Sequence, residues 1–474
     1  MRMAKLVAFL VVFPILLLLG VGVLGEKNKN KNYKVDIVNV ASLRGKDGDA
    51  EGKNCSAIQL GESSFALMHA RGKCSPFRLP NATWFATILE AIKGDVYRYQ
   101  VLTRRRNTEK LVDEDVPLAS GNAVNTGNYI IKLEFGTPGQ SFYTAIDTGS
   151  DVTWIPCSPC SGCTRQAFEP SKSTTFNYLS CDSQPCQDLG ISCSGNCVRT
   201  QRYGDGTGVD ELLSTDTVAL GSQSQPVQQF LFGCANAFIG NTNNDPGLVG
   251  FGRDATSFVS QTAELYDRTF SYCLPSRNSR DFTGSLQLGK GPLSAPGLQF
   301  TPLLSNAARP SFYYLALNGI SVGEERVSIP AGTFENDEST GRGIIIDSGT
   351  VITRLVERAY NPVRDSFRLQ LSGLTMVEDS SGFLDTCYKT PPSGQVTVPQ
   401  ITLHFDNNVD LTLPAKNTIT LADDQGSAFC LAFALPPGGS SDLSVLGNHQ
   451  QQNLLVVYDV AGSRLGFASQ NCDG

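Results

Sequence analysis

One short pattern occurs twice in this chain, and each copy is centred on an aspartate. The first copy, YTAIDTGSDVTWIPC, places an apolar run before Asp147 and a Thr-Gly pair after it. The second copy, GRGIIIDSGTVITRL, repeats this order around Asp347. Each copy is followed much later by two apolar residues and a glycine, at Gly250 and at Gly447. Two such units indicate a duplicated lobe, and a pair of lobes that face one another across a cleft is the natural architecture.

The composition is that of a globular protein built mostly of strands. The chain has 474 residues, of which 41% are apolar and 18% are charged, so it can bury a sizeable core. From NTGNYIIKLEF onward, short stretches rich in Val, Ile, Leu, Phe, Thr and Tyr alternate with Gly, Pro, Asn and Asp turns, which predicts an all-β body. Helices are expected at 82–102, 258–266 and 357–371. The seam between the lobes is expected near 300–312.

The N-terminus has the layout of a secretory signal peptide. Basic residues at Arg2 and Lys5 precede an apolar stretch, which ends in small residues near Gly25. A membrane anchor is the alternative, but the polar segment EKNKNKNYK that follows favours cleavage. Residues 1–25 are therefore interpreted as a signal peptide, and no membrane association is expected after its removal.

The cysteines of an exported chain are expected to form disulfide bonds. The chain contains 14 cysteines, and the compartment that an export signal implies is oxidising. Cys157, Cys160 and Cys163 have a spacing that also occurs in zinc and iron–sulfur sites. No histidine lies near this cluster in the sequence, and the export context favours bridges. The region 157–197 is therefore interpreted as a stapled surface loop, and neither a metal nor a cofactor is expected.

Charge is distributed unevenly along the chain. The first 110 residues contain 18 Lys and Arg against 9 Asp and Glu, whereas the rest contains 20 against 36. This split indicates a basic arm on an acidic body, and a detachable prosegment held partly by charge explains it, with a solvated basic tail as the alternative. The run Arg104–Arg106 stands where the arm meets the body, and exposed basic runs are easily cleaved.

Two aspartates at one cleft allow chemistry that neither could perform alone. Like charges a few ångströms apart cannot both stay ionised, so we expect one pKa to be raised and the other lowered. The ionised carboxylate can then act as a general base for a bound water, while the protonated one donates to a carbonyl oxygen.

The residues that follow each aspartate suit this chemistry. Gly149 and Gly349 allow the backbone to turn tightly and to approach its counterpart. Ser150 and Thr350 can donate hydrogen bonds to the carboxylates and help to keep them ionised.

Two other motifs suggest different functions but fit less well. GISVG at 319–323 matches the Gly-x-Ser-x-Gly pattern of a hydrolase nucleophile elbow, yet its context reads as strand, turn and strand, which predicts a hairpin. The lysines of KNKNKNYK could suggest nucleic-acid binding, but they follow the signal peptide and the body is acidic. We therefore expect no nucleic-acid partner.

With these residues in view, the chain resembles the pepsin-like aspartic proteases (peptidase family A1), and within them the plant nepenthesin-like group. The resemblance covers residues 126–473 and rests on DTGSDVTWIPC, the cysteine-rich insert, YGDGT, FSYCL, FYYLALNGISVG, IIIDSGT and LGNHQQQNLLVVYD. The region from FALMHARGKCSPF to VYRYQVLTRRR resembles the prosegment of that group. The resemblance implies an all-β, bilobal fold with two homologous lobes around a central cleft.

The resemblance also implies a function. It implies an aspartic endopeptidase that is made as a zymogen and hydrolyses extended polypeptides at acidic pH, with Asp147 and Asp347 as the catalytic residues and no cofactor. The prosegment would act as an intramolecular inhibitor, and the enzyme would be a monomer in the apoplast or vacuole. The implied domains are a prosegment over 26–116, an N-terminal lobe over 117–310 and a C-terminal lobe over 311–474.

The implied flap, a hairpin that closes over substrate, is RYGDGTG. Tyr203 would be the flap tyrosine with Trp154 as its hydrogen-bonding neighbour, although core packing would explain both residues without the resemblance. Gly204 and Asp205 would offer backbone groups to an extended peptide. Family members usually carry Ser or Thr and then Gly at two places after the flap; here these places hold Val209 and Glu211.

The resemblance further implies a disulfide pattern. The implied pairs are Cys157–Cys160, Cys163–Cys234, Cys181–Cys197, Cys186–Cys193, Cys273–Cys472 and Cys387–Cys430. Both glycosylation sequons, at Asn54 and Asn81, lie in the prosegment, so the mature enzyme is expected to carry no N-glycans. Cys55 and Cys74 lie there too and could bridge each other.

The alternative function is a non-catalytic binding protein on the same fold. Some members of the superfamily inhibit enzymes that degrade cell walls, and these have typically lost a residue of the dyad. Both aspartates and the flap tyrosine are present here, which favours the enzyme.

Overall fold

β-strands are the main secondary structure of the body, as the sequence predicts, and most of their pairings are antiparallel. The structure is a computed structural model. It describes residues 34–43, 63–72, 75–77, 83–103, 129–163, 166–191, 193–202, 208–220, 224–239, 247–276, 284–379, 381–438 and 443–473. Among the helices in these ranges, none combines the length and apolar character needed to cross a lipid bilayer.

The N-terminal lobe is a set of strands that wrap around an aromatic core. Its strands are β3 (Tyr129–Phe135), β4 (Gln140–Asp147), β5 (Trp154–Ser161), β6 (Asn177–Tyr178), β7 (Val198–Arg202), β8 (Gly208–Ala219), β9 (Val227–Ile239) and β10 (Leu248–Gly250). Phe135 and Phe232 lie 5.1 Å apart by ring centroids, and Phe168 packs edge-on against Phe232. Burial of these rings, which is worth more than their area alone, holds the strands together.

A second group of strands joins the lobes. It consists of β11 (Thr269–Cys273), β12 (Gly284–Leu288), β13 (Gln299–Leu304), β28 (Leu454–Asp459) and β29 (Arg464–Ser469). β11 pairs with both β12 and β28, and Phe270 stacks on Tyr458 with centroids 4.3 Å apart. The strand β2 (Ser64–His69) pairs with β12 on one side and with β3 on the other. A segment of the predicted prosegment is therefore part of the sheet.

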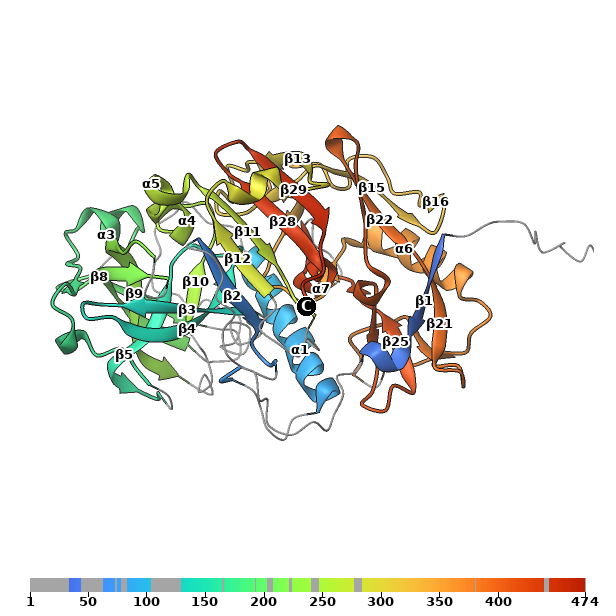
Figure 1. Cartoon of the computed structure of the whole chain (residues 1–474), viewed down its shortest axis with the longest axis horizontal. Helices are drawn as coiled ribbons and strands as arrows, with labels where there is room; N and C mark the ends of the chain where they lie inside the picture. Colours follow the sequence, from blue (N-terminus) through green and yellow to red (C-terminus); the bar gives the residue numbers. More distant parts are fainter. Residues whose placement is uncertain are drawn as a thin grey trace, which may run out of the picture. The chain divides into compact units, whose positions relative to one another are not determined.

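The C-terminal lobe contains several smaller sheets. Around the second aspartate lie β14 (Tyr314–Leu315), β17 (Gly343–Ile346), β18 (Thr353–Arg354), β26 (Phe433–Ala434) and β27 (Leu443–Leu446). One four-stranded sheet has the order β16 (Glu325–Arg326), β15 (Leu317–Val322), β22 (Ile401–Phe405) and β23 (Val409–Thr412). A second four-stranded sheet has the order β19 (Met376–Val377), β20 (Cys387–Lys389), β25 (Ala428–Leu431) and β24 (Ile419–Leu421). The strand β21 (Gln395–Pro399) pairs with β1 (Val35–Asn39), and Figure 1 shows β1, in blue, next to β21 of the C-terminal lobe.

The predicted helices are present. The α-helices are α1 (Trp84–Thr103), α3 (Gln184–Asp188), α4 (Phe258–Gln261), α5 (Ala263–Tyr266), α6 (Glu357–Gln370) and α7 (Asn448–Gln451). The 3-10 helices are η1 (Val40–Leu43), η2 (Pro170–Lys172), η3 (Gly291–Ser294), η4 (Asp406–Asn408) and η5 (Ala415–Asn417). The stretch predicted as one helix at 258–266 forms two, because Thr262 stands between α4 and α5 in a non-helical conformation.

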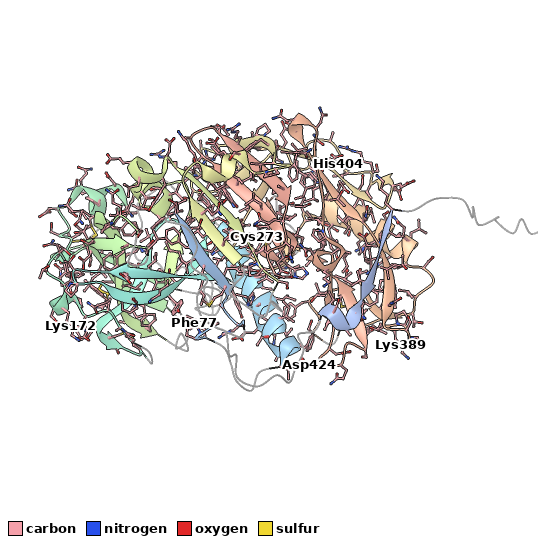
Figure 2. All side chains as sticks on the ribbon, viewed as in Figure 1. Phe77, Lys172, Cys273, Lys389, His404 and Asp424 are labelled. Atoms are coloured by element: carbon pink, nitrogen blue, oxygen red, sulfur yellow. A yellow bond between two sulfur atoms is a disulfide. The ribbon has the colours of Figure 1, made fainter. Side chains whose placement is uncertain are left out.

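The long helix α1 is fastened to the C-terminal lobe at its first turn. The backbone N–H of Phe85 donates to Oδ1 of Asp424 at 2.8 Å, and Figure 2 labels Asp424 beside this end of the helix. A carboxylate at a helix N-terminus accepts a hydrogen bond from an N–H group that has no partner within the helix, and its negative charge interacts favourably with the helix dipole. Ile88 and Ile92, one turn apart, are buried together with residues of the C-terminal lobe.

The two lobes repeat one arrangement around their aspartates. β10 runs parallel to β4 with Gly250 opposite Asp147, and β27 runs parallel to β17 up to the residue before Asp347. A Cβ atom on Gly447 would lie 2.5 Å from the carbonyl oxygen of Val351, and one on Gly250 would collide with the carbonyl of Asp151. Each downstream glycine therefore lets its strand press against the turn that follows the aspartate of its own lobe.

We predict that Gly447→Ala lowers the thermal stability of the chain. The added methyl group meets backbone atoms that cannot rotate away, so we expect a loss of about 1–3 kcal/mol in the free energy of unfolding, typical of an overpacked core. Gly373→Ala is the matched control, because nothing lies within 4 Å of its added Cβ. Thermal unfolding of both variants beside the wild type checks this. Equal melting temperatures for the two variants would contradict it.

Candidate active site

The two aspartates of the repeated pattern meet in the interior of the protein. Asp147 is the last residue of β4, and Asp347 directly follows β17. Their exposed fractions are 2% and 0%. The N–H of Thr148 donates to Oγ of Ser348 at 3.1 Å, and the N–H of Ser348 donates to Oγ1 of Thr148 at 2.9 Å. This reciprocal pair of bonds holds the two turns against each other.

The predicted supporting residues lie beside the carboxylates. Gly149 and Gly349 donate their backbone N–H groups to Oδ1 of Asp147 and of Asp347, both at 3.0 Å. The hydroxyl of Ser150 donates to Oδ2 of Asp147 at 2.5 Å, and that of Thr350 donates to Oδ2 of Asp347 at 2.6 Å. Each carboxylate thus receives the same two bonds from its own turn.

The glycines also allow each turn to approach the opposite carboxylate. A Cβ atom on Gly149 would lie 2.8 Å from Oδ1 of Asp347, and one on Gly349 would lie 2.6 Å from Oδ1 of Asp147. Both distances are shorter than any ordinary contact of a Cβ atom, so a larger residue would push the aspartates apart.

A guanidinium group from α1 lies between the two carboxylates. Arg98 donates from Nη1 and Nη2 to Asp147 at 2.9 and 2.5 Å, and from Nε and Nη2 to Asp347 at 2.9 and 3.0 Å. Every carboxylate oxygen therefore accepts one bond from its own turn and one from Arg98. Charge-assisted bonds of this kind are among the strongest that a protein makes.

The electrostatics of this cluster separate the two carboxyl groups. Burial raises the pKa of Asp147, and neither Arg98 nor the hydrogen bonds offset this fully, while the charge of Asp347 adds to it. Burial acts in the same direction on Asp347, but the charge and hydrogen bonds of Arg98 and the bond from Thr350 hold its pKa below the ordinary value. Burial alone would lower the pKa of Arg98; the two carboxylates raise it instead, so the guanidinium stays charged.

A second charged residue of α1 binds the backbone next to the dyad. Asp95 is fully buried and accepts hydrogen bonds from the N–H groups of Val351 and Ile352, both at 2.8 Å. Burial raises the pKa of Asp95 to about 6, against the lowering effect of the Arg354 charge and of these bonds.

Sequence reasoning did not identify Asp95 and Arg98 as site residues. One signal was available, because the helical spacing from Ile88 and Ile92 places both charges on the apolar face of α1. A charged residue on such a face is costly unless it has a partner, and here the partners are the dyad and the turn that follows Asp347.

Farther along α1, one contact binds the helix to the C-terminal lobe and another binds it to the segment between the lobes. The hydroxyl of Tyr99 donates to the carbonyl of Leu443 at 2.5 Å. Arg309 donates to the carbonyls of Leu102 and Thr103, the latter at 2.7 Å, which are among the last of the helix. A cation at this end is favoured by the helix dipole.

The predicted flap residues Tyr203, Gly204 and Asp205 lie outside the described residues. Trp154 begins β5, is 2% exposed and packs against Phe238. Its predicted role as a neighbour of the flap therefore stays a prediction.

The two departures from the family pattern lie on β8 close to Trp154. Val209 is buried in one cluster with Trp154. Glu211 is fully buried and accepts from Nε and Nη2 of Arg199 at 3.0 and 2.6 Å, and burial raises its pKa against the charge of Arg199. Arg199 thus supplies the partner that a buried carboxylate needs at a place where the family usually has glycine.

Four of the disulfide pairs implied by the resemblance are wrong. The structure instead contains Cys157–Cys234, Cys160–Cys163, Cys181–Cys193 and Cys186–Cys197. The bonds Cys273–Cys472 and Cys387–Cys430 are formed as implied. The implied bond between Cys55 and Cys74, and the sequons at Asn54 and Asn81, lie outside the described residues.

Strand register and burial explain the corrected pairs. β5 runs parallel to β9 with Ile155 opposite Cys234, so Cys157 reaches Cys234 with a Cα–Cα distance of 5.2 Å. Cys186 and Cys197 are both fully buried in one cluster with Val152 and Leu213. Their half-buried neighbours, Cys181 and Cys193, then form the outer bond. Although three of these sulfur atoms lie within 4.8 Å of one another, each belongs to a disulfide.

The GISVG motif lies in a hairpin, as predicted. Ser321 of β15 pairs with Arg326 of β16. Its hydroxyl lies 2.7 Å from Nε2 of His404, whose Nδ1 lies 2.7 Å from Oδ1 of Asp410. Although this order matches a nucleophilic triad, Ser321 lies within an extended strand and not on a strand-to-helix turn. We interpret these bonds as cross-strand contacts on the polar face of the sheet.

Comparisons with known proteins place the chain in one family. Two family models match it, described as "Xylanase inhibitor N-terminal" at residues 129–290 and "Xylanase inhibitor C-terminal" at residues 312–469. The chain is 38% identical to Aspartyl protease 25 of Oryza sativa subsp. japonica over 82% of this chain and 91% of that protein. It is 36% identical to aspartic proteinase nepenthesin-1 of Nepenthes gracilis over 82% and 91%.

Solved structures show the same fold at low sequence identity. Basic 7S globulin from soybean aligns with a TM-score of 0.58 and 22% identity, over 72% of this chain and 93% of that one. The sequence relatives, the two-lobed β-fold and the paired aspartates agree. The chain belongs to the pepsin-like aspartic proteases of plants, in the group that includes the nepenthesins, and is an aspartic-type peptidase that acts on polypeptides.

We predict that Arg98→Met destabilises the full chain at neutral pH. Arg98 holds the pKa of each carboxyl below the value that burial without a counter-ion would give it, so the loss of Arg98 costs most at neutral pH, and the cost falls as acid protonates the carboxyls left without a partner. Removing one partner of a buried ion pair typically costs about 3–5 kcal/mol. Thermal unfolding between pH 5 and 8 should show a deficit that shrinks toward acid. Lys93→Met, at an exposed position of the same helix, is the control and should leave the melting temperature unchanged.

Proposed function

We propose that Asp147 and Asp347 are the catalytic dyad and activate a water molecule for attack on a peptide bond. The observation that carries this proposal is that Nη2 of Arg98 bonds to Oδ1 of both carboxylates, at 2.5 and 3.0 Å. One small polar group at that position reaches both aspartates, and a water can take its place once Arg98 leaves. The ionised carboxylate then accepts a proton from the water, and the protonated one donates to the substrate carbonyl.

We propose further that the full chain is a zymogen, with residues 26–116 as an intramolecular inhibitor. The support is that α1 fills the position that a catalytic water needs. The bonds of Asp95, Tyr99 and Arg309 fasten the same helix on both sides of Arg98. A substrate cannot reach the dyad until this helix moves.

Acid promotes release of the helix in this proposal. The pKa of Asp347 is lowered while Arg98 is bound, so Asp347 contributes stability to the closed state that is lost as the pH falls through this lowered pKa. Asp147 and Asp95 act in the opposite sense, because burial raises the pKa of both in the closed state, that of Asp95 to about 6, and the closed state gains stability as these groups take up protons. Protonation of Asp347, which removes a charge that binds Arg98, must outweigh these two groups for acid to open the cleft.

The remaining assignments complete the proposal. The enzyme enters the secretory pathway through residues 1–25 and works as a monomer in the apoplast or vacuole. Its N-terminal lobe spans 117–310 and its C-terminal lobe 311–474. The mature part carries no N-glycans, and a flap with Tyr203 closes over extended polypeptides.

A binding protein without activity is the second candidate, because the two matching family models are described by the name of an inhibitor. The presence of both aspartates with matched hydrogen bonds supports the peptidase, since an inhibitor surface does not need a paired and buried dyad.

We predict that Asp147→Asn abolishes proteolysis. Hydrolysis of an unfolded protein by the prosegment-free enzyme should be limited to acid pH, blocked by a statine-type transition-state mimic, and reduced by about 10²–10⁴-fold in the variant, which lacks the acid-base partner. Asp182→Asn, at an exposed position, is the matched control and should retain full activity. A folded, disulfide-bonded wild-type enzyme that cleaves nothing at any pH would favour the binding protein.

We predict that the full chain excludes a fluorescent statine-type probe at pH 7 and admits it at pH 3.5. Arg98→Met should admit the probe at pH 7 because the counter-ion that holds the helix on the dyad is gone, whereas Lys93→Met should behave like the wild type. Probe fluorescence across the pH range measures this directly. A wild-type chain that excludes the probe equally at both pH values would contradict the proposed activation by acid.

A further inference from the structure

The strand β21 takes its only strand partner, among the described residues, from the N-terminal arm, which we define as residues 34–43. The two strands run antiparallel from Val35 opposite Pro399 to Asn39 opposite Gln395. One further bond extends the pairing at each end. Gln400 N–H donates to the carbonyl of Lys34 at 3.0 Å, and Val40 N–H donates to that of Gly394 at 2.8 Å. The backbone of the arm therefore matches the whole length of β21.

The side chains of the arm divide into a buried face and an exposed face. Val38, Val40 and Leu43 are 3%, 1% and 7% exposed and belong to the main hydrophobic core. Ile37, by contrast, points outward and is 71% exposed. Removal of three such side chains from water stabilises the contact, at about 25 cal/mol for each Å² of apolar surface buried.

The buried side chains Val38, Val40 and Leu43 occupy a socket whose walls come from the C-terminal lobe. The buried residues Val396 and Val398 of β21 belong to the same core cluster as the buried side chains of the arm. β1 contacts η5, and η1 contacts β24. These contacts are separate from those of α1, which binds the dyad, and of β2, which lies between β12 and β3. The prosegment is thus held at three different places.

We propose that the edge of β21, with the socket for Val38, Val40 and Leu43, is a peptide-binding site distinct from the active site, and that its occupant after maturation is the cleaved arm of this same chain. The mode of binding is β-strand addition, in which backbone bonds supply affinity and pockets select alternate side chains. The inference rests on the proposed zymogen only in assuming that the prosegment is cut.

One consequence concerns inhibition. A prosegment that is cut from the body but still held by its arm keeps α1 at a high effective concentration near the dyad. Release of the helix by acid is then reversible until the arm also dissociates or is severed from the helix. A mature enzyme that retains the arm consists of two chains joined without a covalent bond.

The first experiment measures retention of the arm without any need for activity. Recognition sequences for a site-specific protease are inserted after residue 50 and after residue 110 of the full chain carrying Asp147→Asn. After both cuts, gel filtration at pH 5 is followed by mass spectrometry of the protein peak. We expect the arm peptide to co-elute with the body. Its separate elution at about 10 μM protein would overturn the proposal, since an affinity weaker than this could not retain a released segment.

Matched variants test the face of the arm that binds. Val40→Asp places a charge in the apolar socket and should abolish co-elution, whereas Ile37→Asp places the same charge on the exposed face and should leave it unchanged. The milder pair Val38→Ala and Val40→Ala, which should weaken binding about tenfold or more, serves if Val40→Asp does not fold. Equal behaviour of Val40→Asp and Ile37→Asp would refute the assigned socket.

A second readout uses the active dyad with the single cut after residue 110. After acid treatment, return to pH 6 and dilution, the activity should recover faster with Val38→Ala and Val40→Ala than with the wild type or Ile37→Asp. If the catalytic proposal fails, all variants are inactive while co-elution persists. If the arm site fails, all recover at the same rate.

Discussion

The burial of two carboxylates against a single guanidinium is the interaction on which the rest of this structure depends. Asp147 and Asp347 are almost without solvent, and Arg98 donates to all four of their oxygens. Moving such charges out of water costs several kcal/mol for each ion unless partners compensate. The compensation comes from the helix α1, outside the two lobes, so one contact both stabilises the described fold and fills the position proposed for the catalytic water.

Close backbone approach makes this contact possible. Gly149 and Gly349 leave room for the opposite carboxylate, and Gly250 and Gly447 let a parallel strand press against each aspartate turn. Thr148 and Ser348 then lock the turns together. Because every one of these positions is repeated in the other lobe, each carboxylate receives the same kinds of hydrogen bond from its own turn. The two pKa values nevertheless differ, because burial prevails at Asp147, whereas the charge and hydrogen bonds of Arg98 prevail at Asp347.

The predicted prosegment is an integral part of the described fold and not an appendage. β2 fills the gap between β12 and β3, β1 completes β21, and α1 occupies the dyad. Removing these segments leaves strand edges without partners and apolar side chains without cover. In the proposed zymogen, maturation therefore changes the sheets as well as the surroundings of the two aspartates.

The sequence by itself determined the all-β body, the helix at 82–102 and the repeated motif that carries Asp147 and Asp347, because each of these depends on local pattern. It could not place Arg98 between the aspartates, pair Cys157 with Cys234 or set Val40 into the socket beside β21. Those contacts join residues far apart in the chain, and only strand register and packing decide which of several chemically equivalent partners meet. The physical reason is that residue type alone does not distinguish one arginine or one cysteine from another as a partner, whereas close packing in the folded chain leaves room for a single partner.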